Sequence, residues 1–492
     1  MKAKSVLNTS KLILALGISI VSTSASALTL ADYLEQVKTD NTSYKGSSQQ
    51  SEGAALKSRE ADLFFTPKMF AEAQVGHDGK PSQPKTSDKI KSENYSLGLT
   101  QQFNFGLQSK LYYNLAKTEF VNANTNMISM PEYWDATPKL ELSMPLWGGG
   151  FGRTAQANQE ITRQQNYADQ FQSSYQSVGY LAQAEAAYWK LSAWNDVVVI
   201  QENALKAAQN IFDYVSKKKK MNLGEEADVV QARALVEART LELQVANNEK
   251  KEALRNFNKY LNRNADVTVD SLEPVNYAAL ENLTVPQVRP GDRYDVKATE
   301  AQLATAKANS QLVNERNKPT FDVYGTYALN GRDKEQSDAM KKAGYTETDT
   351  SFVGVRFNMP LNFTATSDVK SGALKTEKAA EYNRQYALYA QEQDWINLTK
   401  SLGDARDNLR LLGRIETLQK TKLDVERSRL RQGRTTTYQV LLFEQDYSQA
   451  ALSKVKSAAN ILGLQTQIKL YNAAGSQSDA GLHSDAVGVE GK

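Results

Sequence analysis

The chain has 492 residues, with 59 Lys and Arg against 56 Asp and Glu, and no Cys. A formal charge of +3 gives no basic surface of the kind that nucleic-acid binding needs, so no nucleic-acid partner is expected. The lack of Cys excludes disulfides, thiolate metal sites and a Cys nucleophile. Only 11 Pro occur, which favours long uninterrupted helices.

The first 27 residues have the features of a secretory signal peptide. Three lysines precede a short apolar segment at 12–21, and an Ala-Ser-Ala cleavage site ends at Ala27. We therefore expect residues 1–27 to be removed and the mature chain to start at Leu28. After this point no apolar run approaches the roughly 18 to 20 residues that a membrane-spanning helix needs, so a membrane role would have to use β-strands.

Alternating apolar residues predict β-strands in two parts of the chain. Between 94 and 105, for example, Tyr95, Leu97 and Leu99 lie on one face and polar residues lie on the other. Because the interval 93–120 is too long for one strand of about 9 to 11 residues, we expect it to form a hairpin that turns near Gly106. The predicted strands lie at about 67–77, 93–105, 107–120, 137–147, 319–330 and 350–361.

This alternation is typical of a transmembrane barrel, which has an apolar face toward lipid and a polar face toward its lumen. A soluble, half-buried sheet shows the same alternation, and the pattern alone leaves both interpretations open. In a barrel, aromatic residues form girdles at the membrane surfaces. We expect the following residues near strand ends, as such a girdle requires: Tyr95, Tyr112, Tyr113, Tyr133, Trp134 and Trp147.

Two long helical hairpins are predicted, at about 154–262 and 366–473. Residues 154–221 contain no Pro, and apolar residues such as Val229 and Ala232 recur at spacings of three and four. The remaining surface is rich in Gln, Asn, Lys and Glu. Such helices are too polar for a globular core and need partner helices along a narrow seam, as in a coiled coil.

The predicted order of strands followed by a helical hairpin occurs twice, which indicates a duplicated unit. "LSMPLW" (142–147) and "FNMPLN" (357–362) each follow a predicted strand and precede a long helix. Pro145 and Pro360 are expected to end strand pairing there, because Pro has no N–H to donate. The predicted parts are a first repeat at 28–264, a linker at 265–291, a second repeat at 292–474 and a tail at 475–492 that is too polar to fold alone.

The turns between the helices support the duplication. Asn222 aligns with Gly433, and the alignment continues without a gap to Tyr260 and Tyr471. Asn and Gly are the residues that best tolerate the left-handed backbone with which many helices end. The duplication therefore extends to the tips of both hairpins.

Several of these segments resemble the TolC-like outer-membrane efflux proteins. "MPLWGGGFGR" (144–153) is similar to the strand-to-helix junction of that family and contains Pro145, Gly148 and Gly149. "RYDVKATEAQL" (293–303) looks like the family's Arg-Pro-Asp segment, although Tyr replaces the usual Pro. The turn that connects the first pair of helices is also similar to the family's tip pattern, with Asn222, Asp228, Val229 and Ala232 at the matching positions. The resemblance covers about 30–473.

The resemblance implies an α+β membrane protein. Three chains would form one transmembrane β-barrel, with four to six strands per chain, continued by a long periplasmic α-helical barrel. Four strands per chain, as is usual in the family, give about twelve strands, whereas the six predicted here give about eighteen.

The implied function is that of an outer-membrane channel in a tripartite efflux or type I secretion system. Such a channel is a passive export duct in the Gram-negative cell outer membrane, with its helical part in the periplasm. Its implied partners are two further copies of the chain, a periplasmic adaptor (membrane fusion protein), an inner-membrane pump and outer-membrane lipid. The exported substrate and the class of pump stay open.

The helical tips are the candidate functional surface, because in the resembling family they close the periplasmic entrance and contact the adaptor. The candidate contact residues are Asn222, Leu223, Gly224, Gly433, Arg434 and Thr435. The alternative is that these residues only connect helices. The gating candidates are Asp228, Gln439 and Glu444: Asp228 could latch the closed state, Gln439 occupies a position that is acidic in the family, and Glu444 could supply that charge or face a neighbouring helix.

No catalytic, cofactor-binding or metal site is predicted, and we do not expect an enzyme. The only two His, His77 and His483, do not lie in a ligand-spaced cluster. Two other functions remain open. One is a periplasmic coiled-coil scaffold or adaptor with a soluble sheet, and the other is a stand-alone diffusion porin, which would leave the long helices unexplained.

Overall fold

The computed structural model describes residues 27–80, 86–269 and 271–472. The expected tail and all but the last residue of the expected signal peptide lie outside these ranges. Within them, no helix is both long enough and apolar enough to cross a membrane.

The chain divides into two compact units, which we describe separately. The first, called the sheet unit, comprises Lys38–Ala186, Glu281–Arg410 and Asn460–Lys492. The second, called the helical unit, comprises Met1–Val37, Ala187–Leu280 and Leu411–Ala459. Each unit therefore combines segments from both predicted repeats.

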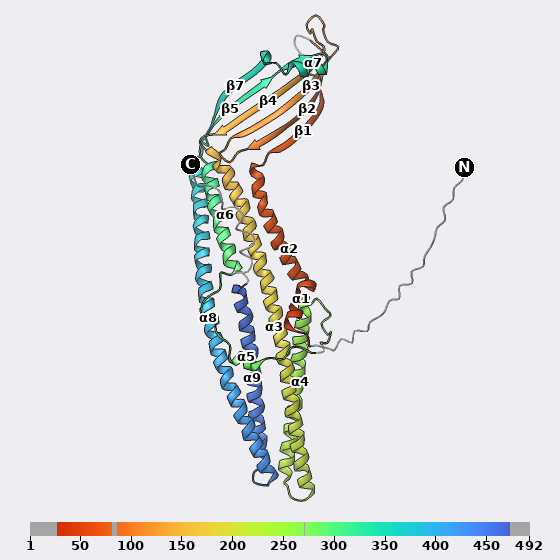
Figure 1. Ribbon diagram of the computed structural model, residues 1–492, viewed down its shortest axis with the longest axis vertical. Coiled ribbons are helices and arrows are strands. Elements are labelled where there is room, and N and C mark those ends of the chain that lie inside the picture. The colour runs from red at the N-terminus through yellow and green to blue at the C-terminus, as the bar shows by residue number, and fades with distance from the viewer. Residues whose placement is uncertain (1–26, 81–85, 270, 473–492) are drawn as a thin grey trace, which may run out of the picture. The chain divides into compact units, whose positions relative to one another are not determined.

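One antiparallel sheet dominates the sheet unit (Figure 1). Its long strands follow the order β1 (Lys68–Asp78), β2 (Lys89–Gln102), β3 (Gln108–Val121), β4 (Glu132–Pro145), β5 (Thr320–Leu329) and β7 (Asp349–Asn358). The short β6 (Gly331–Asp333) pairs with β4. β1 and β7 are the outer strands, and each pairs with a single neighbour among the described strands. The six long strands agree with the upper end of the predicted range of four to six.

The interval 93–120 forms a hairpin, as expected. β2 and β3 pair along their whole length, and Gly106 lies between them with a φ of 96°. The sequence did not predict β6 or the helix α7 (Gln336–Lys342) that follows it. The short, polar α7 depends on tertiary contact, because Ala339 and the following Ala343 pack against β3 and β4.

The strand register gathers the alternating apolar residues on one face of the sheet. Leu97 of β2 lies opposite Ala71 of β1 and Tyr113 of β3. Val323 of β5 lies opposite Val355 of β7. We call this side the apolar face, and the side formed by the alternate, polar residues the polar face. Large exposed side chains of the apolar face are Met69, Val75, Leu97, Leu99, Leu111, Leu142, Val353, Val355 and Phe357.

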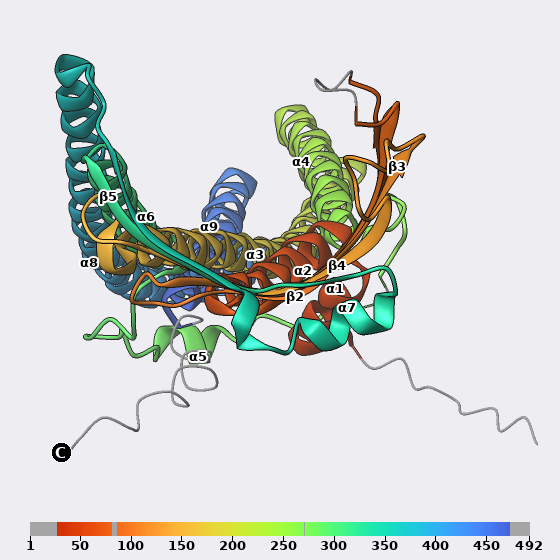
Figure 2. The same ribbon diagram turned by 90° about the horizontal axis from the view of Figure 1, so that it is seen from above.

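Helix α7 identifies which side of the curved sheet is apolar. The cluster of Ala136, Ala339 and Ala343 packs against Tyr113, Leu115 and Trp134, which the register places on the apolar face. Figure 2 shows the sheet curved, with α7 on its convex side. The apolar face is therefore convex and the polar face is concave.

The expected girdle of aromatic residues near strand ends is wrong for three of its members. Tyr95, Tyr112 and Tyr113 lie near the middle of β2 and β3. Tyr112 and Tyr113 also lie on opposite faces, because consecutive residues of a strand alternate in direction. A girdle requires its aromatic residues to share the lipid-facing side of the sheet, which adjacent residues of one strand cannot do.

Long helices make up the two predicted hairpins. They are α3 (Arg153–Lys220) with α4 (Glu226–Tyr260), and α8 (Phe363–Arg431) with α9 (Thr437–Asn472). The ends of α3 and α8 are as many residues apart as Asn222 and Gly433, and so are the starts of α4 and α9. The two hairpins therefore align without a gap around their turns. The shorter helices are α1 (Leu30–Asp40), α2 (Thr42–Lys57), α5 (Tyr277–Glu281) and α6 (Tyr294–Arg316). The 3-10 helices are η1 (Ser58–Phe65), η2 (Gly150–Gly152) and η3 (Thr346–Thr348).

The first strand-to-helix junction differs from the prediction at Pro145. Although Pro145 is the last residue of β4, the N–H groups of Leu146 and Gly148 still donate to the carbonyls of Phe321 and Pro319, at 2.8 and 2.9 Å. Successive N–H groups of a strand point to opposite sides. The N–H that Pro145 lacks would therefore point away from β5. For this reason Pro145 does not end the pairing between this segment and β5.

A buried carboxylate holds the rest of this junction together. Glu315 of α6 accepts a hydrogen bond from the N–H of Gly149 at 3.2 Å and contacts Lys318 and Arg153 at 2.5 and 3.4 Å. Burial alone would raise the pKa of Glu315, but the bonds from Lys318 and Gly149 outweigh it and lower the pKa below its usual value. In the second copy, Pro360 lies just beyond the end of β7.

Candidate functional site

The ends of the two helical hairpins form the candidate site, which lies in the helical unit. Here α3, α4, α8 and α9 pack around one apolar core. Its buried residues are Ile211, Val215, Ala232, Leu423, Leu430, Val440 and Leu441. Because all four helices contribute to this core, both turns are supported by the same packed side chains.

The two turns have the same backbone geometry. Asn222 and Gly433 both adopt a left-handed backbone, with φ of 59° and 71°, as their residue types predicted. Their N–H groups donate to the carbonyl three residues earlier, at 2.9 and 3.0 Å, and those of Leu223 and Arg434 donate to the carbonyl five residues earlier, each at 2.9 Å. This pair of bonds is the Schellman motif, which satisfies carbonyls at a helix C-terminus.

The side chains of the two turns differ in character. Leu223 is 70% exposed and Met221 is 61% exposed, so the first turn presents apolar surface to solvent. In the second turn, the hydroxyl of Thr435 donates to the buried Glu426, which also pairs with Arg429 at 3.2 Å. The structure places all the predicted contact residues in or beside these turns: Asn222, Leu223, Gly224, Gly433, Arg434 and Thr435.

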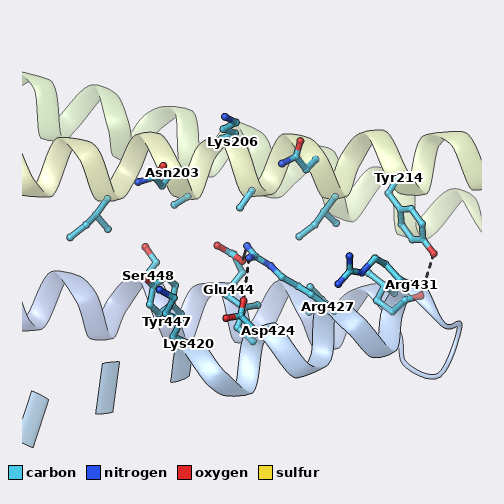
Figure 3. A pocket seen from close by; sticks show the side chains of 18 residues that line it. Asn203, Lys206, Tyr214, Lys420, Asp424, Arg427, Arg431, Glu444, Tyr447 and Ser448 are labelled. Atoms are coloured by element: carbon cyan, nitrogen blue, oxygen red, sulfur yellow. Dashed lines mark hydrogen bonds and ion pairs between the residues drawn. The ribbon is translucent and has the colours of Figure 1, made fainter. Parts of the chain in front are cut away.

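A groove of about 850 Å³ lies between α3 and the α8–α9 hairpin. Figure 3 shows Arg427 of α8 reaching Glu444 of α9, with 2.6 Å between the charged atoms. Glu444 is almost fully buried. Burial raises its pKa above the usual value of 4.5, although Arg427 acts in the opposite direction. In this structure Glu444 therefore faces the neighbouring helix, which is one of the two alternatives that the sequence left open.

The other gating candidates lie at the starts of the return helices. Asp228 is in the first turn of α4, where the helix dipole favours a negative charge. Its side chain forms no hydrogen bond or ion pair with any residue in the described ranges, so the expected latch to the second hairpin is not present here. Gln439 is in the first turn of α9, and its backbone N–H donates to the hydroxyl of Thr436 at 3.3 Å.

A different residue links the two hairpins. The hydroxyl of Tyr214, on α3, donates to the carbonyl of Leu430, on α8, at 3.3 Å. Lys218 lies over the Tyr214 ring, 5.1 Å from its centroid. No local pattern distinguishes Tyr214 from the other aromatic residues of the helix, so the sequence does not predict this contact.

Ion pairs between α8 and α9 were also missed. They join Arg427 to Glu444 at 2.6 Å, Lys422 to Asp446 at 3.1 Å and Glu416 to Lys454 at 2.9 Å. A signal for them exists in the sequence, because the midpoint of each pair falls in the turn that connects the two helices. Opposite charges at roughly equal distances from a hairpin turn face each other when the helices are antiparallel.

Among the residues that the structure describes, no group of three His, Asp or Glu side chains is arranged to hold a metal ion. Two ionisable groups of the groove, Arg427 and Glu444, are instead paired with each other.

Comparison with solved structures shows the fold. The chain is similar to the outer-membrane channel OprN, with 18% identity, a TM-score of 0.62 and coverage of 90% of this chain and 89% of that one. It is similar to the outer membrane protein VceC of Vibrio cholerae, with 12% identity, a TM-score of 0.62 and coverage of 91% and 96%. It is similar to the open state of the MtrE outer membrane channel of Neisseria gonorrhoeae, with 16% identity, a TM-score of 0.62 and coverage of 91% and 88%.

These similarities extend over most of both chains in each pair. No protein-family model matches this chain, and no curated protein matches its sequence. The TolC-like fold expected from the sequence is therefore confirmed by structure, at a level of identity where sequence comparison gives no match.

Proposed function

We propose that this protein is an outer-membrane channel that serves as a passive export duct, without enzymatic activity, in a tripartite efflux or type I secretion system. The observation that carries the proposal is a fold shared with outer-membrane channels over about nine-tenths of the chain. The continuous apolar face of the sheet supports it, because large exposed apolar surfaces mark contact with lipid or another protein.

We further propose that three copies close one transmembrane barrel. β1 and β7 are long outer strands, and a long free edge promotes pairing with another chain. Pairing β7 of one copy with β1 of the next removes every free edge. Six long strands per copy then give about eighteen in a closed trimer, a size that leaves a water-filled channel in known barrels.

The proposed partners are a periplasmic adaptor at the helical turns and an inner-membrane pump beyond it. The exposed Leu223 and Met221 support an adaptor contact, because loops that present apolar side chains on a rigid scaffold commonly bind other proteins. Asn222, Gly224, Gly433, Arg434 and Thr435 are proposed to belong to the same surface.

Conductance of the purified mature protein in planar lipid bilayers tests this function. We expect small channels that are closed for most of the recording, since no pump or adaptor is present to open the tips. Large channels that stay open would support the stand-alone porin instead. Folded protein that forms no channels and does not partition into outer membranes would support the periplasmic scaffold.

A further inference from the structure

Basic and aromatic side chains form a cluster on the concave, polar face of the sheet. We call its cations, which are Lys68, Lys110, Lys139 and Arg356, the basic belt. The register places Lys68 opposite Thr100, which in turn lies opposite Lys110. Lys68, Thr100 and Lys110 thus form a row across β1, β2 and β3, at the end of the sheet where β1 begins.

Aromatic rings lie against three of these cations: Lys110, Arg356 and Lys139, the last 5.7 Å from the centroid of Tyr112. The ammonium group of Lys110 lies between Phe70 and Tyr112, at 4.9 and 4.6 Å from the ring centroids. The Arg356 guanidinium lies 5.1 Å from the centroid of Tyr324. A cation held against an aromatic face is attracted by the ring quadrupole, so these charges have defined positions before any ligand binds.

Two glycines leave space beside these rings. A Cβ at Gly354 would lie 2.6 Å from Cζ of Tyr324, and a Cβ at Gly98 would lie 2.4 Å from Cβ of Tyr112. Larger residues at either position would displace the aromatic residue on the neighbouring strand. The lack of a side chain at these two glycines therefore gives room to the tyrosines that lie against the cations.

Three of the four belt cations line a hollow of about 620 Å³ on the polar face. These are Lys68, Lys110 and Arg356, and among the described residues that line the hollow Glu141 is the one carboxylate. Glu141 is paired with Lys139 at 2.7 Å. In the described part of the chain, none of the three lining cations forms an ion pair, so their charges are available to a ligand.

Four further carboxylates of the described strands belong to the same face: Glu72 and Asp78 on β1, Asp135 on β4, and Asp322 on β5, which lies opposite Arg356. Asp135 is paired with Arg332 at 2.7 Å. None of the four lines the hollow. The charge at the hollow itself therefore stays positive.

We propose that the basic belt binds anionic solutes and makes the duct prefer anions to cations. This inference rests on the proposed channel function. With three copies around one lumen, each belt cation is present three times, and rings of Lys and Arg select anions in pores. The cargo class that fits this surface is anionic, with phosphate or carboxylate groups for the cations.

Ion selectivity in planar bilayers tests the belt. The wild-type protein is compared with Lys110→Gln/Arg356→Gln and with Lys117→Gln, measuring the reversal potential across a KCl gradient. Lys117 is a matched control, because it lies on the same strand but on the apolar face, where it pairs with Glu132. A second measurement adds tripolyphosphate and records the concentration that halves the conductance.

We expect a chloride-to-potassium permeability ratio above unity in the wild type and a fall of roughly two-fold or more in the double variant. Lys117→Gln should leave the ratio unchanged, and tripolyphosphate should block the wild type at lower concentration than the double variant. Potassium preference in the wild type, or equal ratios in wild type and double variant, would overturn the proposal. Folded protein without any channels would instead overturn the duct, and the belt's role in selectivity with it.

Discussion

Glu315 is a buried residue whose charge contributes to stability. Its carboxylate is 5% exposed and contacts Lys318 and Arg153. We expect Glu315→Gln to lower the free energy of unfolding by about 1–3 kcal/mol, because a neutral amide leaves both cations less well paired. Thermal unfolding of the purified protein, followed by circular dichroism, measures the change.

The pH dependence of this effect has a defined sign. Because the folded-state pKa of Glu315 lies below its usual value of 4.5, its contribution is complete above pH 4.5 and is lost as the pH falls through the lowered pKa. The wild type and Glu315→Gln should therefore differ most near neutral pH. Glu300→Gln is the matched control, since Glu300 is on the same helix and paired with Arg384 but 63% exposed. Its effect should stay below about 1 kcal/mol, and equal effects of the two variants would contradict the prediction.

Glu444 should show the opposite pH dependence. Its folded-state pKa is raised above 4.5, so at intermediate pH the folded protein holds a proton that the unfolded chain has released. The stability of the wild type relative to Glu444→Gln should therefore fall as the pH rises from 4.5 through the raised pKa, by up to about 1.4 kcal/mol per pH unit. Unfolding curves across this range measure the difference, and a constant difference would contradict the prediction.

At the scale of elements, the contact between the two hairpins is expected to affect gating. Tyr214→Phe removes the hydrogen bond to the Leu430 carbonyl but keeps the ring. A bond of this kind contributes about 1 kcal/mol, so we expect the ratio of open to closed channels to rise by about five-fold in single-channel recordings. Tyr438→Phe is the control, because Tyr438 is also near a turn but is 56% exposed. An unchanged ratio in Tyr214→Phe would show that this bond does not hold the hairpins together.

The two faces of β2 should tolerate a charge very differently. Leu97 lies on the apolar face and Ser96, its neighbour, on the polar face, where it donates to Asn114. If the apolar face contacts lipid, Leu97→Lys should destabilise the protein in membranes by about 2–4 kcal/mol, and Ser96→Lys by much less. Urea unfolding in lipid vesicles measures both variants. Similar stabilities would indicate that the apolar face does not contact the membrane interior.

Elements with a repeating pattern were predictable, and those fixed by distant contacts were not. The alternation through Leu97 and Leu99 and the turn at Gly106 follow from local residue types. Helix α7 does not, because its position depends on packing against Tyr113 and Trp134. In the candidate site, the backbone of the turns was predictable from Asn222 and Gly433. The partner of Glu444 was not, because pairing with Arg427 requires the register of two helices.

For the whole molecule, the duplicated sequence explains the order of elements but leaves the two copies unequal. The first copy supplies β1 to β4 and the second supplies β5 and β7 as long strands. The additional strands in the first copy, β2 and β3, pair with each other and with their neighbours on both sides. In a closed ring of identical chains related by a single rotation axis, unlike edges must therefore meet, β1 of one copy with β7 of the next.

Engineered cysteines test this closure directly, since the natural chain contains no Cys. Ala73→Cys on β1 is combined in turn with Val353→Cys or Val355→Cys on β7, because the three residues share the apolar face. Oxidation should join copies into covalent trimers when the Cα atoms come within about 7 Å. Leu111→Cys on the interior strand β3 replaces Ala73→Cys in the control and should give no such products. If every β1–β7 combination stayed monomeric after oxidation, the trimeric barrel would be ruled out and the sheet would need another partner for its two free edges.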